Sequence, residues 1–431
     1  MPPPRYTLLW IFVALSASIC LIGRATAEIL ATLLPDGVPG YDDAPGVTIE
    51  TRLHPEQMPL GLRDGPLIAQ ASIAQGIGYN SNALPGPYRR GSWQIGTAPT
   101  LALGTGWSHD AIGALVSIDD RRALSLPAQS RTDATISAGG RLDMGENQIA
   151  IAAAHIVQHE DRGSLDTIAS DRPVAFQVDN LRAKVTLNDG RWSLIPGIEI
   201  SRWTYDATTI LGQPASQWYR DRIETQGSLT LRYEWLPLRD VVLVLRVLDQ
   251  DYLDTPAGQI SPNSIGFQVL TGVSDMSDPV WHWRVLLGGE ARRFAAPAYK
   301  ARDTLIAEAG ATWSPDGMTT VGATISRETD AAAEEGISGL AYTTARLTLV
   351  HECLRDLLLK ASFGWQDAEY FQGGYQSGPS FDLGLTWAVN RSLRVSLTYD
   401  QIDLRGSRFI GTTPLAGYSR GVGLLSMRMG L

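Results

Sequence analysis

Apolar and polar residues alternate along most of the chain, and the segment 222–235 shows the pattern most clearly. Its odd positions are mostly apolar or aromatic and end in Tyr233 and Trp235. Its even positions are polar and carry four charged residues: Arg222, Glu224, Arg232 and Glu234. In a β-strand a period of two places these sets on opposite faces. The segment therefore predicts a strand with one apolar face and one charged face.

The same alternation recurs in the segments 181–188, 357–366, 381–389 and 393–400. A soluble β-sandwich alternates too, so the pattern alone does not decide the class of protein. The segments run for about 11–15 residues, whereas strands of soluble proteins usually have about 5–6. Aromatic residues gather at the ends of the oily faces, as they do at the two membrane interfaces of outer-membrane barrels. Length and aromatic placement together predict strands that cross a membrane.

Turn residues divide the chain at regular intervals. Short turns, such as Gly145–Asn147 and Asp189–Arg191, alternate with longer polar loops, such as Asp161–Pro173. Eight short turns and nine longer loops predict 18 antiparallel strands between about residue 68 and residue 431, with boundaries uncertain by about 2–4 residues. The number falls to 16 if the segments 132–144 and 148–159 are not strands.

Such strands must close on themselves in a membrane. Lipid offers no hydrogen bonds, so every backbone polar group has to be paired within the protein, which only helices and closed barrels achieve. No apolar run of about 18 residues follows the first 27 residues. We therefore predict an all-β protein, a closed antiparallel transmembrane β-barrel whose last strand, Gly417–Leu431, pairs with the first. An even strand number and short periplasmic turns place the start of the first strand and the end of the last strand in the periplasm of a Gram-negative bacterium, so both barrel ends of the chain are periplasmic.

The order of charged, apolar and small residues at the start of the chain predicts an export signal. Arg5 precedes an apolar run at residues 7–22, and Ala25-Thr26-Ala27 forms a cleavage site. Residues 1–27 are thus predicted to be a signal peptide. Residues 28–65 contain five prolines, do not alternate, and are predicted to be a Pro-rich periplasmic extension, which leaves residues 66–431 for the outer-membrane barrel. Whether the extension enters the lumen as a plug stays open at this point.

Composition excludes some functions. The 36 Lys and Arg against 45 Asp and Glu give a formal net charge of −9, and no basic stripe is present, so nucleic-acid binding is not expected. One of the two cysteines lies in the predicted signal peptide, so the exported chain cannot form an internal disulfide. The expected partners are outer-membrane lipids and the outer-membrane insertion machinery.

The strand phase assigns ten basic and seven acidic residues to the lumen of the barrel. Charges across a pore can set its selectivity. Alternatively, the charged residues pair along adjacent strands and only keep the interior hydrated. The candidate lumen residues are Arg182, Lys184, Glu199, Arg222, Glu224, Arg232, Glu234, Arg246, Arg284, Glu290, Arg292, Glu308, Arg346, Lys360, Asp382, Arg394 and Asp400.

Catalysis has little support in the sequence. The chain has six histidines, of which His155 and His159 are placed on one strand face by their spacing of four. A metal site would need a third ligand, and Glu160 points the other way. No G-x-S-x-G or H-E-x-x-H motif occurs. We expect no catalytic residues, no metal and no cofactor.

Stretches at the strand ends resemble a known family. They are Gly78-Tyr79-Asn80-Ser81-Asn82, His159-Glu160-Asp161-Arg162-Gly163-Ser164, Trp203-Thr204-Tyr205-Asp206 and, more loosely, Asp249-Gln250-Asp251-Tyr252. Each is similar to a stretch of the putative β-barrel porin family 2 of bacterial outer-membrane proteins, and the resemblance extends from about residue 67 to residue 431.

The resemblance implies a porin-like barrel and no assigned catalytic residues. Because the family often accompanies exopolysaccharide genes, it also implies polysaccharide export components as partners. The expected function is a water-filled channel for small hydrophilic solutes or an exported polysaccharide. The alternatives are a non-conducting assembly or structural component of an exopolysaccharide export system and, with less support, an outer-membrane enzyme.

Overall fold

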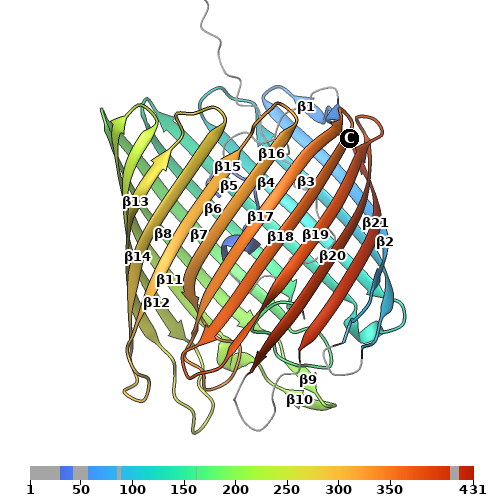
Figure 1. The fold of residues 1–431 in the computed structure, drawn as a ribbon, viewed down its shortest axis with the longest axis vertical. Coiled ribbons are helices and arrows are strands. Elements are labelled where there is room, and N and C mark those ends of the chain that lie inside the picture. The colour runs from blue at the N-terminus through green and yellow to red at the C-terminus, as the bar shows by residue number, and fades with distance from the viewer. Residues whose placement is uncertain (1–29, 42–56, 85–88, 162, 408–416) are drawn as a thin grey trace, which may run out of the picture.

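The structure is a computed structural model that describes residues 30–41, 57–84, 89–161, 163–407 and 417–431. The predicted signal peptide lies outside these residues. Across the described residues, eighteen long strands form one antiparallel barrel, which Figure 1 shows from the side. No helix in this part of the chain is long and apolar enough to cross a membrane.

The barrel strands follow one another around the wall in chain order. They are β2 (Leu67–Asn80), β3 (Ser92–Thr105), β4 (Ala111–Ala123), β5 (Arg131–Met144), β6 (Asn147–His159), β7 (Ala175–Asp189), β8 (Trp192–Tyr205), β11 (Arg222–Leu236), β12 (Arg239–Tyr252), β13 (Ser264–Asp275), β14 (Trp281–Phe294), β15 (Arg302–Trp313), β16 (Thr319–Asp330), β17 (Leu340–Leu354), β18 (Leu357–Tyr370), β19 (Tyr375–Ala388), β20 (Leu393–Ser407) and β21 (Tyr418–Gly430).

Shorter elements lie outside this series. They are helix α1 (Leu30–Leu33), strand β1 (Leu62–Asp64), which pairs with β2, the hairpin of β9 (Thr208–Ile210) and β10 (Gln213–Ala215), and the 3-10 helices η2 (Pro127–Gln129) and η3 (Trp218–Arg220). The sequence did not predict β1 or the β9–β10 hairpin.

The barrel closes between its first and last strands. β2 pairs with β21 from Ser72 opposite Gly430 to Asn80 opposite Val422, and on its other side β2 pairs with β3. The predicted closed barrel of 18 strands is confirmed. The alternative of 16 strands is wrong, because β5 and β6 are both complete and fully paired.

The two ends of the barrel differ. Short turns join the strands at one end, the upper end in Figure 1, and longer loops join them at the other, where the β9–β10 hairpin lies. The shortest turns rely on glycine: Gly145 and Gly190 have φ of 69° and 58°, a region that favours residues without a Cβ. The C-terminal strand ends at the short-turn end, beside β1.

The outer face of the wall is apolar and is bordered by aromatic rings. Leucines in mid-strand, such as Leu229 and Leu385, are exposed on it. Near the short turns, Trp192 packs against Tyr233 with ring centroids 4.6 Å apart. Exposed aromatics near the short turns include Trp192, Trp235, Trp281, Trp313 and Trp387, and those near the loops include Tyr79, Trp93, Trp365 and Tyr399. Two aromatic girdles around an apolar band are typical of outer-membrane barrels.

Candidate functional site: the barrel lumen

Charged side chains line the inside of the wall. The structure places all seventeen predicted lumen residues on the strand face opposite the exposed apolar row of their own strand. Arg246, for example, lies between the outward-facing Leu245 and Val247, which are 39% and 41% exposed. A role of these residues in selectivity stays a prediction, but their contacts can now be described.

The centre of the most buried group is an ion pair on β14. The Arg292 Nε lies 2.7 Å from a Glu290 carboxylate oxygen, and both residues are at most 2% exposed. Arg292 also donates to the Gln250 side chain at 2.7 Å. Glu290 accepts hydrogen bonds from Gln268 at 2.8 Å and from Thr329 at 2.6 Å. The pair thereby links β12, β13, β14 and β16.

Neighbouring pairs extend this network along the wall. Arg222 binds Glu224 at 2.7 Å, and Glu224 also accepts from Gln250 at 3.1 Å. Arg246 reaches across from β12 to Glu308 on β15, with 2.6 Å between the nitrogen and the oxygen. Contacts across several strands are possible because the wall curves inward. For these residues the pairing expected as an alternative is observed.

The remaining predicted residues lie at three levels of the wall. In mid-wall, Arg346 pairs with Asp382 at 2.8 Å. On the inner wall nearer the loops, Arg182 lies opposite Glu199, and Asp400 lies 3.6 Å from the guanidinium of Arg420. Those toward the short turns are mostly basic: Lys184, Arg232, Glu234, Arg284, Lys360 and Arg394.

The segment of residues 30–41 lies inside the barrel. Its Val38 and Tyr41 are buried against inward-facing residues of β6, β7 and β8, and Leu30, Leu33 and Leu34 pack on the same cluster. Tyr41 donates a hydrogen bond to Asn180 at 2.7 Å. Burial, together with the nearby Glu199 carboxylate, raises the pKa of Tyr41 above its ordinary value, so the hydroxyl keeps the proton that it donates. The sequence left open whether this segment enters the lumen, and for residues 30–41 it does.

Small residues in the wall make room for this segment. A Cβ added to Gly113 on β4 would lie 2.7 Å from the Pro39 ring, and one added to Gly139 on β5 would overlap the Pro39 carbonyl oxygen. Gly40 in turn lies against Ala152 on β6. The position of residues 38–41 therefore depends on glycine in the facing wall.

The loop between β6 and β7 crosses the other end of the lumen. Leu165, from this loop, is buried in one cluster with Leu340 of β17, Tyr370 of β18 and Ile402 of β20. In the order of strands around the barrel, β17, β18 and β20 are far from β6 and β7. The Asp166 carboxylate accepts the N–H of Ala333, from the loop between β16 and β17, at 2.7 Å. The loop thus spans the mouth instead of extending away from it.

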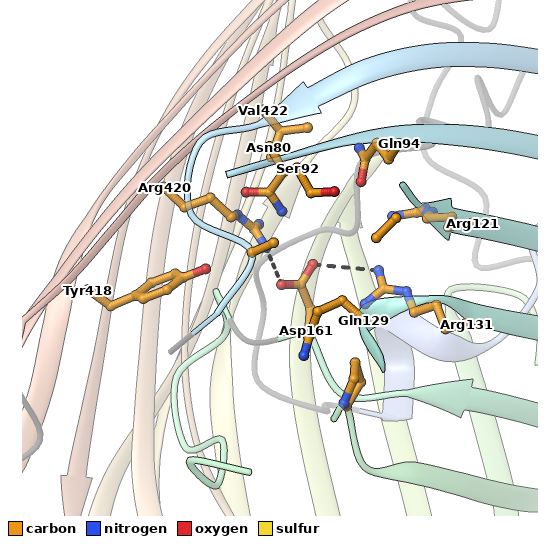
Figure 2. A pocket seen from close by; sticks show the side chains of 13 residues that line it. Asn80, Ser92, Gln94, Arg121, Gln129, Arg131, Asp161, Tyr418, Arg420 and Val422 are labelled. Carbon is orange, nitrogen blue, oxygen red and sulfur yellow. Dashed lines mark hydrogen bonds and ion pairs between the residues drawn. The ribbon is translucent and has the colours of Figure 1, made fainter. Parts of the chain in front are cut away.

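Two buried ion pairs hold the start of this loop. Glu160 binds Arg220 at 2.5 Å, and both side chains are at most 5% exposed. Asp161 binds Arg420 of β21 and lies 3.8 Å from Arg131 of β5. Figure 2 shows the Asp161 carboxylate between these two guanidinium groups, beside a small pocket of about 60 Å³.

The pKa of Asp161 reflects these contacts. Burial alone would raise it, but the Arg420 and Arg131 guanidinium groups and the N–H of Gly163 hold the pKa of this carboxyl at about 2. The carboxylate stays charged at any ordinary pH, so the contact between the loop and β21 is permanent under these conditions.

Two of the four strand-end stretches noticed in the sequence connect neighbouring parts of the barrel. Glu160 and Asp161 anchor the crossing loop. Ser81 exchanges hydrogen bonds with Gly421, at 2.9 and 2.8 Å, and Asn82 donates to the Ser419 carbonyl at 3.0 Å, so both hold β2 to β21 at the barrel seam. These stretches therefore have structural roles at the loop end of the barrel.

Sequence reasoning did not identify the arginines that form ion pairs with Glu160 and Asp161. Arg420 is one: it lies on the inward face of β21, opposite the row formed by Leu425, Met427 and Met429. The same period of two could have identified it. Arg131 and Arg220 had no comparable signal, because they lie at a strand start and in a 3-10 helix.

His155 and His159 each contact a different carboxylate. His155 is on the outer face and contacts Asp179 at 2.7 Å, whereas His159 contacts Asp133 at 2.8 Å. Within the described ranges, no three His, Cys, Asp or Glu side chains are grouped so that they could hold a metal ion.

A cavity of about 640 Å³ lies inside the barrel. Leu30, Leu34, Asp36 and Tyr41 of the inner segment form one side of it. The other sides come from inward-facing residues of β7, β8, β11, β12 and β15–β19. The cavity is thus the part of the lumen that the inner segment leaves free.

A family model described as Putative beta-barrel porin 2 matches residues 54–428. The chain belongs to this family. The resemblance seen in the strand-end stretches is confirmed, and the protein is a porin-like β-barrel of the Gram-negative outer-membrane type, a class that is generally not enzymatic.

The chain is similar to several solved structures at low sequence identity. The FrpB iron transporter from Neisseria meningitidis is 10% identical with a TM-score of 0.46, and the match covers 83% of this chain and 65% of that one. The outer membrane protein opdK from Pseudomonas aeruginosa is 11% identical with a TM-score of 0.43, covering 84% and 98%. Acinetobacter baumannii OccAB4 is 12% identical with a TM-score of 0.45, covering 84% and 98%. No match to the chain was found among curated protein sequences.

Proposed function

We propose that the protein is an outer-membrane channel for small hydrophilic solutes, in which residues 30–41 and the β6–β7 loop narrow the lumen. The observation that carries this proposal is the cavity of about 640 Å³ inside a wall of 18 strands with a charged inner face. Barrels of 16–18 strands are wide enough to leave an aqueous channel. We infer no catalytic role.

The size of the cavity favours small solutes as cargo. Small-molecule pockets usually measure about 300–1,000 Å³, a range that includes this cavity. The exported polysaccharide that the family resemblance implies is a continuous chain. It would need an open path past both the inner segment and the crossing loop. The link to exopolysaccharide export that the family resemblance implies therefore stays a prediction.

A second candidate is a non-conducting assembly component of an export system. It is favoured by one feature: the lumen is narrowed at two levels, once by residues 30–41 and once by the loop that contains Leu165. If both stay in place at all times, the barrel conducts little and serves as a membrane anchor for partners.

We also propose an orientation. Short turns are typical of the periplasmic end of outer-membrane barrels, and long loops are typical of the outer end. The short turns, β1 and the end of β21 would then face the periplasm, as expected for a chain exported by a signal peptide at residues 1–27 and inserted by the outer-membrane machinery.

Single-channel recording in planar bilayers tests the channel proposal. We expect steady, ohmic openings after insertion of the refolded protein, and none with refolding detergent alone. A folded barrel that stays closed at all voltages would contradict the channel and favour the assembly component.

A further inference from the structure

The charges around the lumen cavity are unequal. Seven acidic residues line it, Asp36, Glu199, Glu224, Asp249, Glu308, Glu328 and Asp330, together with three cationic residues, Arg182, Arg246 and Arg346. This local excess of acid differs from the whole predicted lumen set, in which basic residues are more numerous.

Each of the three cations already faces a carboxylate. Arg246 pairs with Glu308 at 2.6 Å, and Arg346 pairs with Asp382 at 2.8 Å. Arg182 lies directly opposite Glu199 in the register of β7 and β8. The cationic side chains that line the cavity therefore already have carboxylate neighbours within the wall.

Asp249 lies on the outward face of β12, in phase with Leu245 and Val247, and three inward carboxylates remain without such a cation. Glu328 and Asp330 lie two residues apart on β16, so they share its inward face. No Lys or Arg of the described residues lies within ion-pair distance of either, and Asp330 accepts only the N–H of Ala331, at 2.7 Å. Asp36, on the inner segment, is exposed to the cavity from its other side.

Glu328 and Asp330 are half-buried, and both line the cavity. A carboxylate in such a place costs free energy unless a cation or hydrogen-bond donors meet it. Neutral donors stand nearby on the cavity wall, among them Ser326, Thr344 and Gln366. The site is therefore complementary to a positively charged solute with polar groups around its charge.

The arrangement does not suit a chelated metal. Among the described residues, these carboxylates are not grouped closely enough to act as shared ligands. Separated carboxylates around a cavity of this size fit a hydrated monovalent cation or a small organic ammonium solute, which is attracted by the field and not held by fixed bonds.

We propose that the cavity makes the channel selective for monovalent cations, and that Glu328, Asp330 and Asp36 provide this selectivity. The proposal rests on the channel function proposed above.

The reversal potential of single channels in a potassium chloride gradient tests it. For the unchanged protein we expect the sign that indicates preference for potassium over chloride. Replacing both carboxylates of β16, as Glu328→Gln with Asp330→Asn, should shift the reversal potential toward zero. The matched control, Asp316→Asn, changes an exposed carboxylate of the short turn between β15 and β16 and should leave the potential unchanged.

Asp36→Asn provides an independent variant, because Asp36 is exposed and its replacement leaves the wall intact. It should shift the potential in the same direction. A preference for chloride in the unchanged protein, or equal potentials in all variants, would overturn the selectivity proposal while leaving the channel intact. A barrel that never conducts would overturn the channel itself, and this proposal with it.

Discussion

The outer and inner faces of the barrel wall are stabilised in different ways. On the outer face, Leu229 and Leu385 are exposed, and each suits a position that faces lipid by being apolar. On the inner face, Glu290 is buried with three partners, Arg292, Gln268 and Thr329, which come from different strands. The difference teaches that an outer position depends on the type of its residue, whereas an inner position depends on the presence of its partners.

A charge placed on the outer face gives the largest expected effect. Leu229→Arg should prevent or strongly reduce assembly, because an arginine on the lipid face near the midplane costs about 2–4 kcal/mol. The control is Gln226→Arg, three residues away on the same strand but facing the cavity. The amount of folded protein in outer-membrane fractions measures both. Equal amounts of the two variants would mean that the assignment of the two faces is wrong.

Removal of a partner on the inner face should act locally and less strongly. Asp161→Asn deletes the charge that binds Arg420 and Arg131, and the β6–β7 loop should then open more often while the barrel stays folded. Hydrogen exchange of the loop peptides between residues 163 and 174 measures this opening.

The pH dependence of this loop follows from the same carboxyl. Its pKa is about 2 in the folded protein against 3.8 ordinarily. The contact therefore contributes fully above pH 3.8 and is lost as the pH falls through 2, with a total of about 2 kcal/mol. Exchange protection should be constant from pH 4 upward and fall below it. Protection that falls equally in Asp161→Asn would show that another group is responsible.

How much could be predicted from sequence follows the same division. The period of two, the spacing of the turns and the need for closure were enough to predict the outer face, the number of strands and the pairing of the first strand with the last. They were also enough to place residues such as Arg246 and Glu308 inside. They could not pair these two residues, since the contact crosses two intervening strands and depends on wall curvature. Nor could they show that Leu165 lies against β17 and β20, because no local pattern records a contact across the lumen.

The N-terminal segment shows a limit of what composition can predict. Residues 28–65 looked like an extension without a core of its own because of their prolines. In the structure, Pro39 is one of the residues that fit the wall, where Gly113 and Gly139 leave space for it. The barrel supplies the core for residues 30–41, and a segment considered alone cannot reveal it.

The central claim is that residues 38–41 occupy and narrow an aqueous lumen, and two neighbouring glycines of β5 offer the most direct test. Gly139→Ala would place a methyl group where the Pro39 carbonyl lies, whereas Gly140→Ala points outward and meets nothing nearer than 3.6 Å. The measurement is single-channel conductance of the two variants beside the unchanged protein. We predict a larger conductance for Gly139→Ala and an unchanged conductance for Gly140→Ala. Equal conductance in all three folded proteins would contradict the claim.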